Sequence, residues 1–136
     1  MKLGDPLTLP CGAVIPNRIA KAAMTEGLAD IYGRPTPELN KLYGIWSDGG
    51  AGLLVSGNIL IDSDHLERPG NVIIDAPPDE EASAALQRWT KMATRHGNHF
   101  WAQISHAGRQ TMKAVNRRPK APSAVKLGLP GGQFGT

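Results

Sequence analysis

Three short apolar segments alternate with two amphipathic helical patterns along the chain, and this order restricts the fold more than any other feature. The segments 19–22, 52–59 and 100–104 have the length and apolar character of buried strands. Strands that alternate with helices favour parallel pairing with helical crossovers. The sequence therefore predicts an α/β fold.

The two intervening helices are predicted by their start signals and by their apolar faces. Thr36 is placed to cap the first helix, with Pro37 in its first turn, and Gly49 follows its last residues. Asp79 opens the second helix and Gly97 ends it. Apolar residues at three- and four-residue spacing form one face of each helix: Leu39, Leu42, Tyr43 and Trp46 in the first, and Ala85, Leu86, Trp89, Met92 and Ala93 in the second.

The remaining segments extend this order at both ends. A hairpin is predicted where 7–9 and 13–15 flank a turn, whereas 62–78 and 105–136 show no period and are expected to be irregular. A (β/α)8 barrel needs about 250 residues. A chain that ends soon after its third strand would be less than half of such a barrel.

Composition excludes several classes of protein. The chain has 136 residues, of which 40% are hydrophobic, and its 15 Lys and Arg residues are scattered, so nucleic acid is not an expected partner. The only cysteine, Cys11, excludes an internal disulfide, and no spacing of metal ligands occurs. No apolar run is long enough for a signal peptide or a membrane helix. We therefore expect a cytoplasmic protein without a metal and without a membrane partner.

Small residues at the end of the first strand indicate a ligand site. In α/β sheets and barrels, ligands lie at the carboxyl ends of the strands. Ala22 and Ala23 would form the floor for a flat ligand, and the hydroxyl of Thr25 would meet its rim. A tightly packed strand and turn is the alternative interpretation.

Several motifs resemble one family when they are taken in order. They are Asn17-Arg18, Ala23-Met24-Thr25, the glycine-rich stretch 49–58, the stretch Gln103-Ile104-Ser105-His106-Ala107-Gly108-Arg109, and Ala121-Pro122-Ser123. Together, over about residues 7–123, they resemble the N-terminal part of the old yellow enzyme family of FMN-dependent NAD(P)H oxidoreductases. The resemblance implies a (β/α)8 TIM barrel, of which residues 1–136 would supply the N-terminal hairpin and about the first three strands, as part of a single FMN-binding domain without a second domain.

The resemblance also implies which residues contact the flavin. Residues Ala22, Ala23, Met24 and Thr25 match the segment that runs along the isoalloxazine ring, and Thr25 would stabilise charge on the reduced ring. Gly57 and Asn58 match the end of the second strand, and Gln103 matches a glutamine that faces the pyrimidine edge. As alternatives, Gln103 would only satisfy backbone groups, and Gly57-Asn58 would only be a turn.

The chain also departs from the family. Ala23 stands where many members have proline, and Gly27 stands where some have a tyrosine that faces the substrate. The catalytic residues and the phosphate-binding arginines of the family are expected beyond Thr136. The sequence leaves open the partner of Lys21 and the roles of His106 and Arg109.

The predicted function of the whole protein is hydride transfer from NAD(P)H through FMN to an activated alkene or a similar small-molecule acceptor. On this interpretation residues 1–136 do not catalyse alone. One alternative is a flavin barrel like the tRNA dihydrouridine synthases. Another is a non-catalytic half-barrel for binding or assembly, as a homo-oligomer or completed by another chain. The substrate and the choice between NADH and NADPH stay open.

Overall fold

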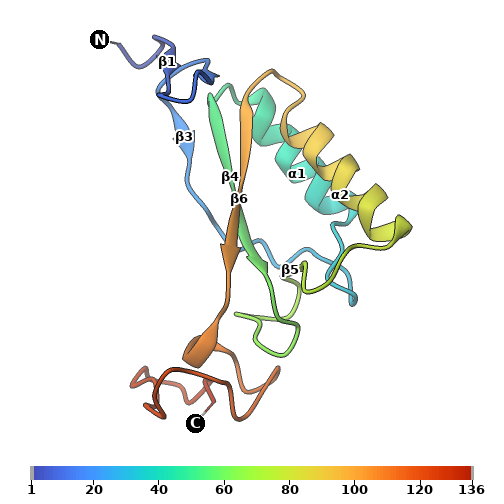
Figure 1. The fold of residues 1–136 in the computed structure, drawn as a ribbon, viewed down its shortest axis with the longest axis vertical. Coiled ribbons are helices and arrows are strands. Elements are labelled where there is room, and N and C mark those ends of the chain that lie inside the picture. The colour runs from blue at the N-terminus through green and yellow to red at the C-terminus, as the bar shows by residue number, and fades with distance from the viewer. Residues whose placement is uncertain (1, 136) are drawn as a thin grey trace.

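The computed structural model describes residues 2–135, in which a small hairpin, a parallel sheet with two helices and a C-terminal loop segment follow one another (Figure 1). The hairpin pairs β1 (Leu7–Thr8) with β2 (Val14–Ile15) in antiparallel fashion. The elements that follow it are β3 (Ala20–Lys21), α1 (Pro37–Asp48), β4 (Leu53–Leu60), β5 (Val72–Ile73), α2 (Glu80–Ala93) and β6 (His99–Ser105). The predicted alternation of strands and helices is confirmed.

Strand β4 is the centre of the four-stranded sheet, and all its pairings are parallel. Near its start it pairs with β3, and near its end it pairs with β5 through Ile59 and Leu60. Strand β6 lies along its other edge over most of its length. The short β5 falls in a connection that was expected to be irregular, because two residues are too few to show a period.

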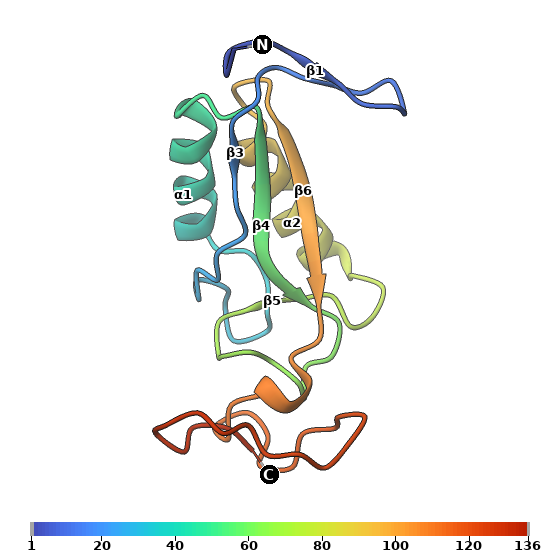
Figure 2. The same cartoon turned by 90° about the vertical axis from the view of Figure 1, so that its left-hand side faces the viewer.

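Both helices lie on one face of the sheet (Figure 2). The core between the two layers consists of Leu39, Tyr43, Leu54, Ile59, Val72, Trp89 and Ala93, all buried. The ring of Tyr43 lies edge-on to Trp46, Trp89 and Phe100 at centroid distances of 4.8, 5.2 and 5.2 Å. Such edge-to-face contacts stabilise aromatic cores beyond the area that they bury. The aromatic cluster therefore fixes both helices against β4 and β6.

The predicted helix starts are confirmed, and one predicted end is displaced. Thr36 Oγ1 accepts from the backbone N–H of Leu39 at 3.3 Å, and Asp79 Oδ1 accepts from that of Ala82 at 2.7 Å. Helix α2 ends at Ala93, before Gly97. The reason is Asn98, whose side-chain amide donates to the carbonyl of Ala93 at 2.8 Å and so satisfies the last turn.

The other face of the sheet carries no covering element within residues 2–135 (Figures 1 and 2). Phe100 packs against the helices, whereas its neighbour Trp101 points away from them and remains 44% exposed. An apolar side chain of this size on an uncovered sheet face is consistent with the inner surface of a larger sheet structure.

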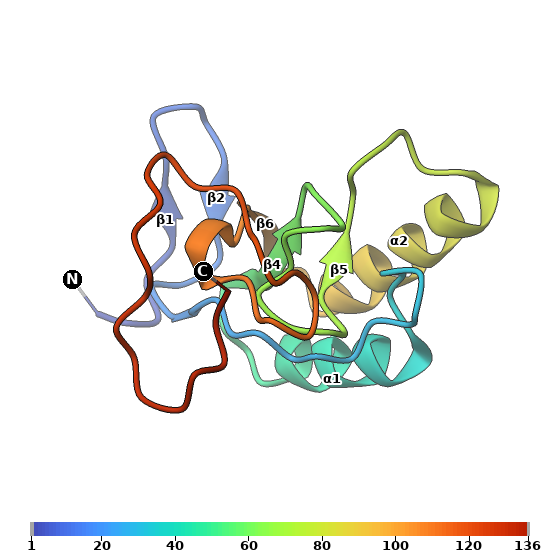
Figure 3. The ribbon, with the colours of Figure 1, turned by 90° about the horizontal axis from the view of Figure 1, so that it is seen from below.

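Residues 106–135 form a loop segment beyond the carboxyl ends of the strands (Figure 3). It contains one 3-10 turn, Gly108–Gln110, and one bridge between Met112 and Phe134. His65, which is buried, holds this segment because its Nε2 accepts from the backbone N–H of Lys120 at 2.8 Å.

Asp62 joins two imidazole rings below the strand ends. Its Oδ2 lies 2.9 Å from Nδ1 of His65 and 3.5 Å from Nε2 of His106, and the two rings stack. His106 Nδ1 in turn accepts from the backbone N–H of Gly108. Both nitrogens of each ring thus have partners within the protein, so we assign this cluster a structural role. The sequence leaves the role of His106 open, and the structure shows its contacts with Asp62, His65 and Gly108.

The carboxylate of Asp62 makes folding depend on pH. The hydrogen bond with His65 is the main cause that lowers the pKa of Asp62. A group with a lower pKa in the folded state stabilises folding above its unfolded pKa, about 4, and this stability is lost as the pH falls through the folded value. Asp62→Asn should therefore lower the denaturation midpoint above about pH 5, and the difference from wild type should shrink toward about pH 2.

The measurement is a series of urea denaturation curves at stepped pH. Asp64→Asn is the matched control, since the neighbouring Asp64 side chain is exposed. A difference between wild type and Asp62→Asn that does not change with pH would contradict this role of the carboxylate.

Candidate functional site

Side chains from the ends of β4 and β6, from the chain that follows β3 and from one loop meet at the carboxyl end of the sheet. Asn58 of β4 and Gln103 of β6 are register partners, and Gln103 Nε2 donates to Asn58 Oδ1. Asn58 Nδ2 donates to Glu67 Oε2 at 2.7 Å, and the hydroxyl of Thr25 donates to the same oxygen. We call Thr25, Asn58, Glu67 and Gln103 the strand-end network. All four are partly buried.

A β-bulge in β4 places Asn58 opposite Gln103. Between Val55 and Asn58 the register shifts, so that β4 carries one residue more than β6. The hydroxyl of Ser56 holds the bulge, because it donates to the carbonyl of Gly57 at 2.7 Å and accepts from the backbone N–H of Gln103 at 2.8 Å. Ser56 is fully buried. Its two hydrogen bonds replace ladder bonds that the bulge breaks.

Removal of this hydroxyl should destabilise the protein and disturb Gln103. Ser56→Ala leaves the partly buried N–H of Gln103 without this acceptor, which costs about 1–3 kcal/mol. The expected result is a lower urea midpoint together with a shifted backbone amide resonance of Gln103. Ser63→Ala, at an exposed loop position, is the control and should change neither. Unchanged stability of Ser56→Ala would show that the bulge does not depend on the hydroxyl.

Gly57 of β4 lies directly against the chain that follows β3. A Cβ at this position would overlap the carbonyl oxygen of Met24 and the carboxylate of Glu26. The backbone N–H of Gly57 donates to the hydroxyl of Tyr43 at 3.0 Å, and this hydroxyl donates to Glu26. Burial is the main cause that raises the pKa of Tyr43, with Glu26 adding to it, so the phenol keeps its proton. The chain after β3 is thereby tied to the aromatic core.

Lys21 finds its partners on the helix side of β3. Its ammonium group donates to the carbonyl of Ala22 at 2.8 Å and lies 4.3 Å from the centre of the Trp46 ring. Burial lowers the pKa of Lys21, and the nearby Glu26 opposes this effect. Lys21 thus contributes to packing between β3 and α1 and does not reach the strand-end network.

The other predicted site residues lie along the chain that leaves β3. Ala22 is exposed, Ala23 is partly buried and Met24 is 50% exposed. The structure therefore brings Thr25, Asn58 and Gln103 into one network and leaves Ala22 to Met24 as an accessible edge beside Gly57. Contact of these residues with a flavin stays a prediction.

Three contributors to the site were missed by sequence reasoning. Glu67 falls in the irregular connection after β4, where a single glutamate gives no pattern. Ser56 is predicted only as a strand residue, and no role is predicted for Glu26. The hydrogen bonds that identify them join residues 9 to 47 positions apart, so local sequence carries no signal for them.

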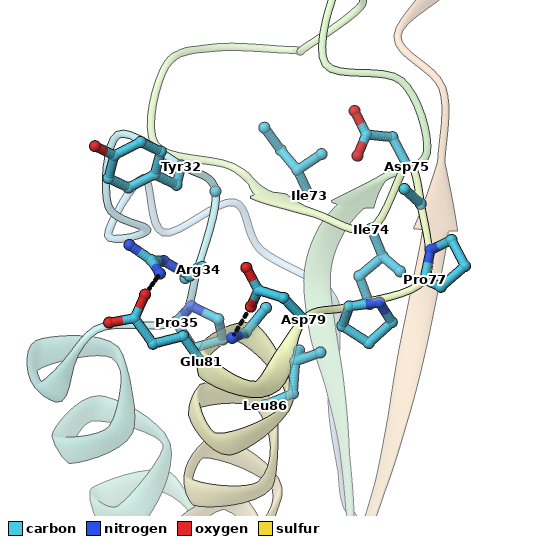
Figure 4. A pocket seen from close by; sticks show the side chains of 14 residues that line it. Tyr32, Arg34, Pro35, Ile73, Ile74, Asp75, Pro77, Asp79, Glu81 and Leu86 are labelled. Carbon is cyan, nitrogen blue, oxygen red and sulfur yellow. Dashed lines mark hydrogen bonds and ion pairs between the residues drawn. The ribbon is translucent and has the colours of Figure 1, made fainter.

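A separate cavity of about 440 Å³ lies beside the start of α2 (Figure 4). Arg34 on its wall pairs with Asp30 and Glu81, and Asp79 caps the helix. The remaining wall is formed by the side chains of Tyr32, Ile73, Ile74, Asp75, Pro77 and Leu86, among others. Because Arg34, Glu81 and Asp79 already serve as partners for one another or for the helix, we assign no ligand to this cavity.

Among the helices of residues 2–135, none has both the length and the apolar character that a membrane span requires.

Known proteins resemble this chain in sequence and in fold. No family model matches the chain. It is 34% identical over 106 residues to the NADH-dependent flavin oxidoreductase iliE of Hypocrea jecorina, an alignment that covers 77% of this chain and 26% of that protein. Among solved structures, the old yellow enzyme homologue of Zymomonas mobilis superposes with a TM-score of 0.78 at 28% identity, over 92% of this chain and 34% of the other. Morphinone reductase in complex with tetrahydroNAD superposes with a TM-score of 0.76 at 24% identity, over 91% and 33%.

These matches establish the fold class. The hairpin, β3, β4 and β6 with their two helices are the beginning of a (β/α)8 TIM barrel, as predicted. The chain is similar to the N-terminal portion of the old yellow enzyme family, and the resemblance of its motifs to that family is confirmed. It spans about a quarter of the curated relative and about a third of each solved structure.

The donor set at the strand ends fits the edge of a flavin. Within residues 2–135, Gln103 Oε1 accepts no hydrogen bond, and one proton of Nε2 is also free. A carboxamide with one free acceptor and one free donor side by side matches the alternating carbonyl and N–H groups of a pyrimidine edge. The hydroxyl of Thr25 adds an oxygen at the end of the neighbouring strand.

Proposed function

We propose that the protein is a flavin-dependent oxidoreductase that uses a nicotinamide as reductant. The observation that carries this proposal is the strand-end network, in which Thr25, Asn58 and Gln103 meet at the carboxyl ends of parallel strands. Ligands of barrels bind at this end. The relatives named NADH-dependent flavin oxidoreductase and the old yellow enzyme homologue support the same class.

FMN is the cofactor that we propose, with hydride passing from NAD(P)H to an activated alkene or a similar small molecule. FMN, when bound, supplies the hydride acceptor and donor in one ring. Gln103 would orient the pyrimidine edge through its free carbonyl oxygen and N–H. The accessible chain from Ala22 to Met24 would lie along the ring, and Gly57 keeps that chain close to β4. These residues would bind and orient the cofactor.

The partners and setting follow from the same proposal. A small-molecule acceptor is the expected partner, with neither nucleic acid nor membrane involved, in the cytoplasm. Residues 1–136 would act as part of one barrel domain, whose uncovered sheet face forms its interior. Homo-oligomerisation is compatible with this arrangement.

The proposed flavin-dependent function can be tested in a chimeric barrel. In this chimera, residues 1–136 replace the matching N-terminal third of the Zymomonas mobilis homologue. The expected product carries bound flavin, seen by visible absorption after gel filtration, and loses that absorption when NADH is added without oxygen. Gln103→Leu should lower the flavin content, whereas Gln87→Leu on the exposed side of α2 should not. A folded chimera without bound flavin would refute the proposal.

A further inference from the structure

The strand-end network contains a carboxylate whose position gives the other side chains a fixed hydrogen-bonding direction. Glu67 Oε2 accepts from both the Thr25 hydroxyl and the Asn58 amide. Its other oxygen lies 3.6 Å from the guanidinium of Arg68, and the side chain is 29% exposed. Glu67 lies in the connection between β4 and β5, so that a loop contributes to a group otherwise made of strand ends.

A carboxylate only accepts hydrogen bonds, and this property determines the orientation of two amides in turn. Because Glu67 accepts, Asn58 has to present its NH2 group to it, and the carbonyl oxygen of Asn58 then faces Gln103. Gln103 has to present its own NH2 group to that oxygen. The carbonyl oxygen of Gln103 therefore does not face Asn58 and stays available to a ligand.

Thr25 is affected in the same way. A threonine hydroxyl has a single proton, and here that proton is donated to Glu67. Toward a bound ligand Thr25 then offers lone pairs alone. This differs from the expectation that Thr25 donates to the reduced ring and stabilises charge there.

We propose that Glu67 is a positioning residue of the flavin site, which sets the order of donors and acceptors that Gln103 and Thr25 present to the cofactor. The inference rests on the proposed flavin function. The ligand that fits this order has an N–H group facing Gln103 Oε1 and a carbonyl facing the free Nε2 proton. Beside Thr25 it has a hydrogen-bond donor. An isoalloxazine ring in its reduced, N5-protonated form satisfies all three.

The first test uses the 136-residue chain without any flavin. Glu67→Gln keeps the size of the side chain but allows it to donate as well as accept, so the amides of Asn58 and Gln103 lose their fixed direction. In nitrogen–proton correlation spectra, the side-chain amide signals of both residues should be single in wild type and broadened or doubled in Glu67→Gln. Thr25→Val should leave them single, because the carboxylate remains. Glu38→Gln, an exposed glutamate in α1, is the charge-matched control.

Single, unshifted amide signals in Glu67→Gln would overturn the inference, whatever the result with flavin. Glu67→Asp keeps an acceptor and should restore single signals, which separates loss of direction from general loosening of the loop. Circular dichroism of each variant shows whether the fold is kept. If Glu67→Gln does not fold, Thr25→Val and Glu67→Asp still test the inference. Broadened or doubled amide signals in Glu67→Asp would contradict the role of the carboxylate in fixing the orientation of both amides.

The second test uses the chimeric barrel. Glu67→Gln should weaken flavin binding about tenfold, the effect of one well-placed hydrogen bond, and should change the flavin reduction potential. Thr25 then becomes free to donate, and a negative charge beside the ring is removed. If wild-type chimera binds no flavin, the proposed function fails while the amide test still stands. If it binds flavin and Glu67→Gln changes neither affinity nor potential, the role of Glu67 toward the cofactor is refuted.

Discussion

Gly57→Ala is expected to destabilise the protein by about 3 kcal/mol, at the upper end of the cost of overpacking. The new methyl group would overlap the carbonyl oxygen of Met24, which belongs to the backbone and cannot rotate away, and the carboxylate of Glu26. Relief requires the chain after β3 to separate from β4. The bond between the Gly57 N–H and the Tyr43 hydroxyl would lengthen at the same time. Urea denaturation followed by circular dichroism measures the loss.

The same variant should affect the site more than the core. Because the chain that carries Met24 and Thr25 has to move, flavin binding by the chimeric barrel should be lost at concentrations that saturate the wild-type sequence. Gly128→Ala is the control, since nothing lies within 4 Å of a Cβ there and the backbone needs no glycine. A Gly57→Ala chain with wild-type stability would mean that the close approach of the two segments is not required.

Trp89→Ala is expected to have the largest effect on stability, a loss of about 3–5 kcal/mol. Trp89 is 2% exposed and packs against both Tyr43 and Phe100, with ring centroids 5.2 and 5.0 Å apart. Its removal leaves a cavity at the point where both helices meet the sheet. Loss of this magnitude is a large part of the stability of a small domain, so the thermal transition should be lowered strongly or abolished.

The matched comparison is Trp101→Ala in the same chain. Trp101 lies on the uncovered face and is 44% exposed, so the same chemical change should cost less than half as much. Trp89→Phe is informative as well. The indole N–H of Trp89 is buried and has no hydrogen-bond partner among residues 2–135, and a phenyl ring removes this group while keeping most of the packing. Equal losses for Trp89→Ala and Trp101→Ala would contradict the assignment of the core.

The fold was largely accessible from sequence because its signals are local. Thr36 and Asp79 mark helix starts through caps that reach only three residues along the chain. Apolar spacing identifies helix faces, and short apolar runs identify strands. By contrast, β5 has two residues and is held by pairing with β4, which no local pattern reveals.

The site was accessible only in part. The family resemblance pointed to Thr25, Asn58 and Gln103, which the structure brings together, although their contact with a cofactor stays a prediction. Sequence reasoning did not identify Glu67, because its role depends on a loop that folds back onto the strand ends. Composition and spacing do not encode such a contact, since any polar residue in that loop gives the same pattern.

The bulge at Ser56 has a further consequence for the chemistry of the surface that β4 presents. Side chains of a strand alternate between its two sides with a period of two, and one extra residue reverses the phase of everything after it. With the bulge, Asn58 lies beside Gln103 and Ile59 lies in the apolar core. If the same residues paired one for one without the bulge, these positions would be exchanged, turning an amide into the core and an isoleucine toward the other face. The capacity of this strand to offer polar groups at its end therefore depends on the bulge.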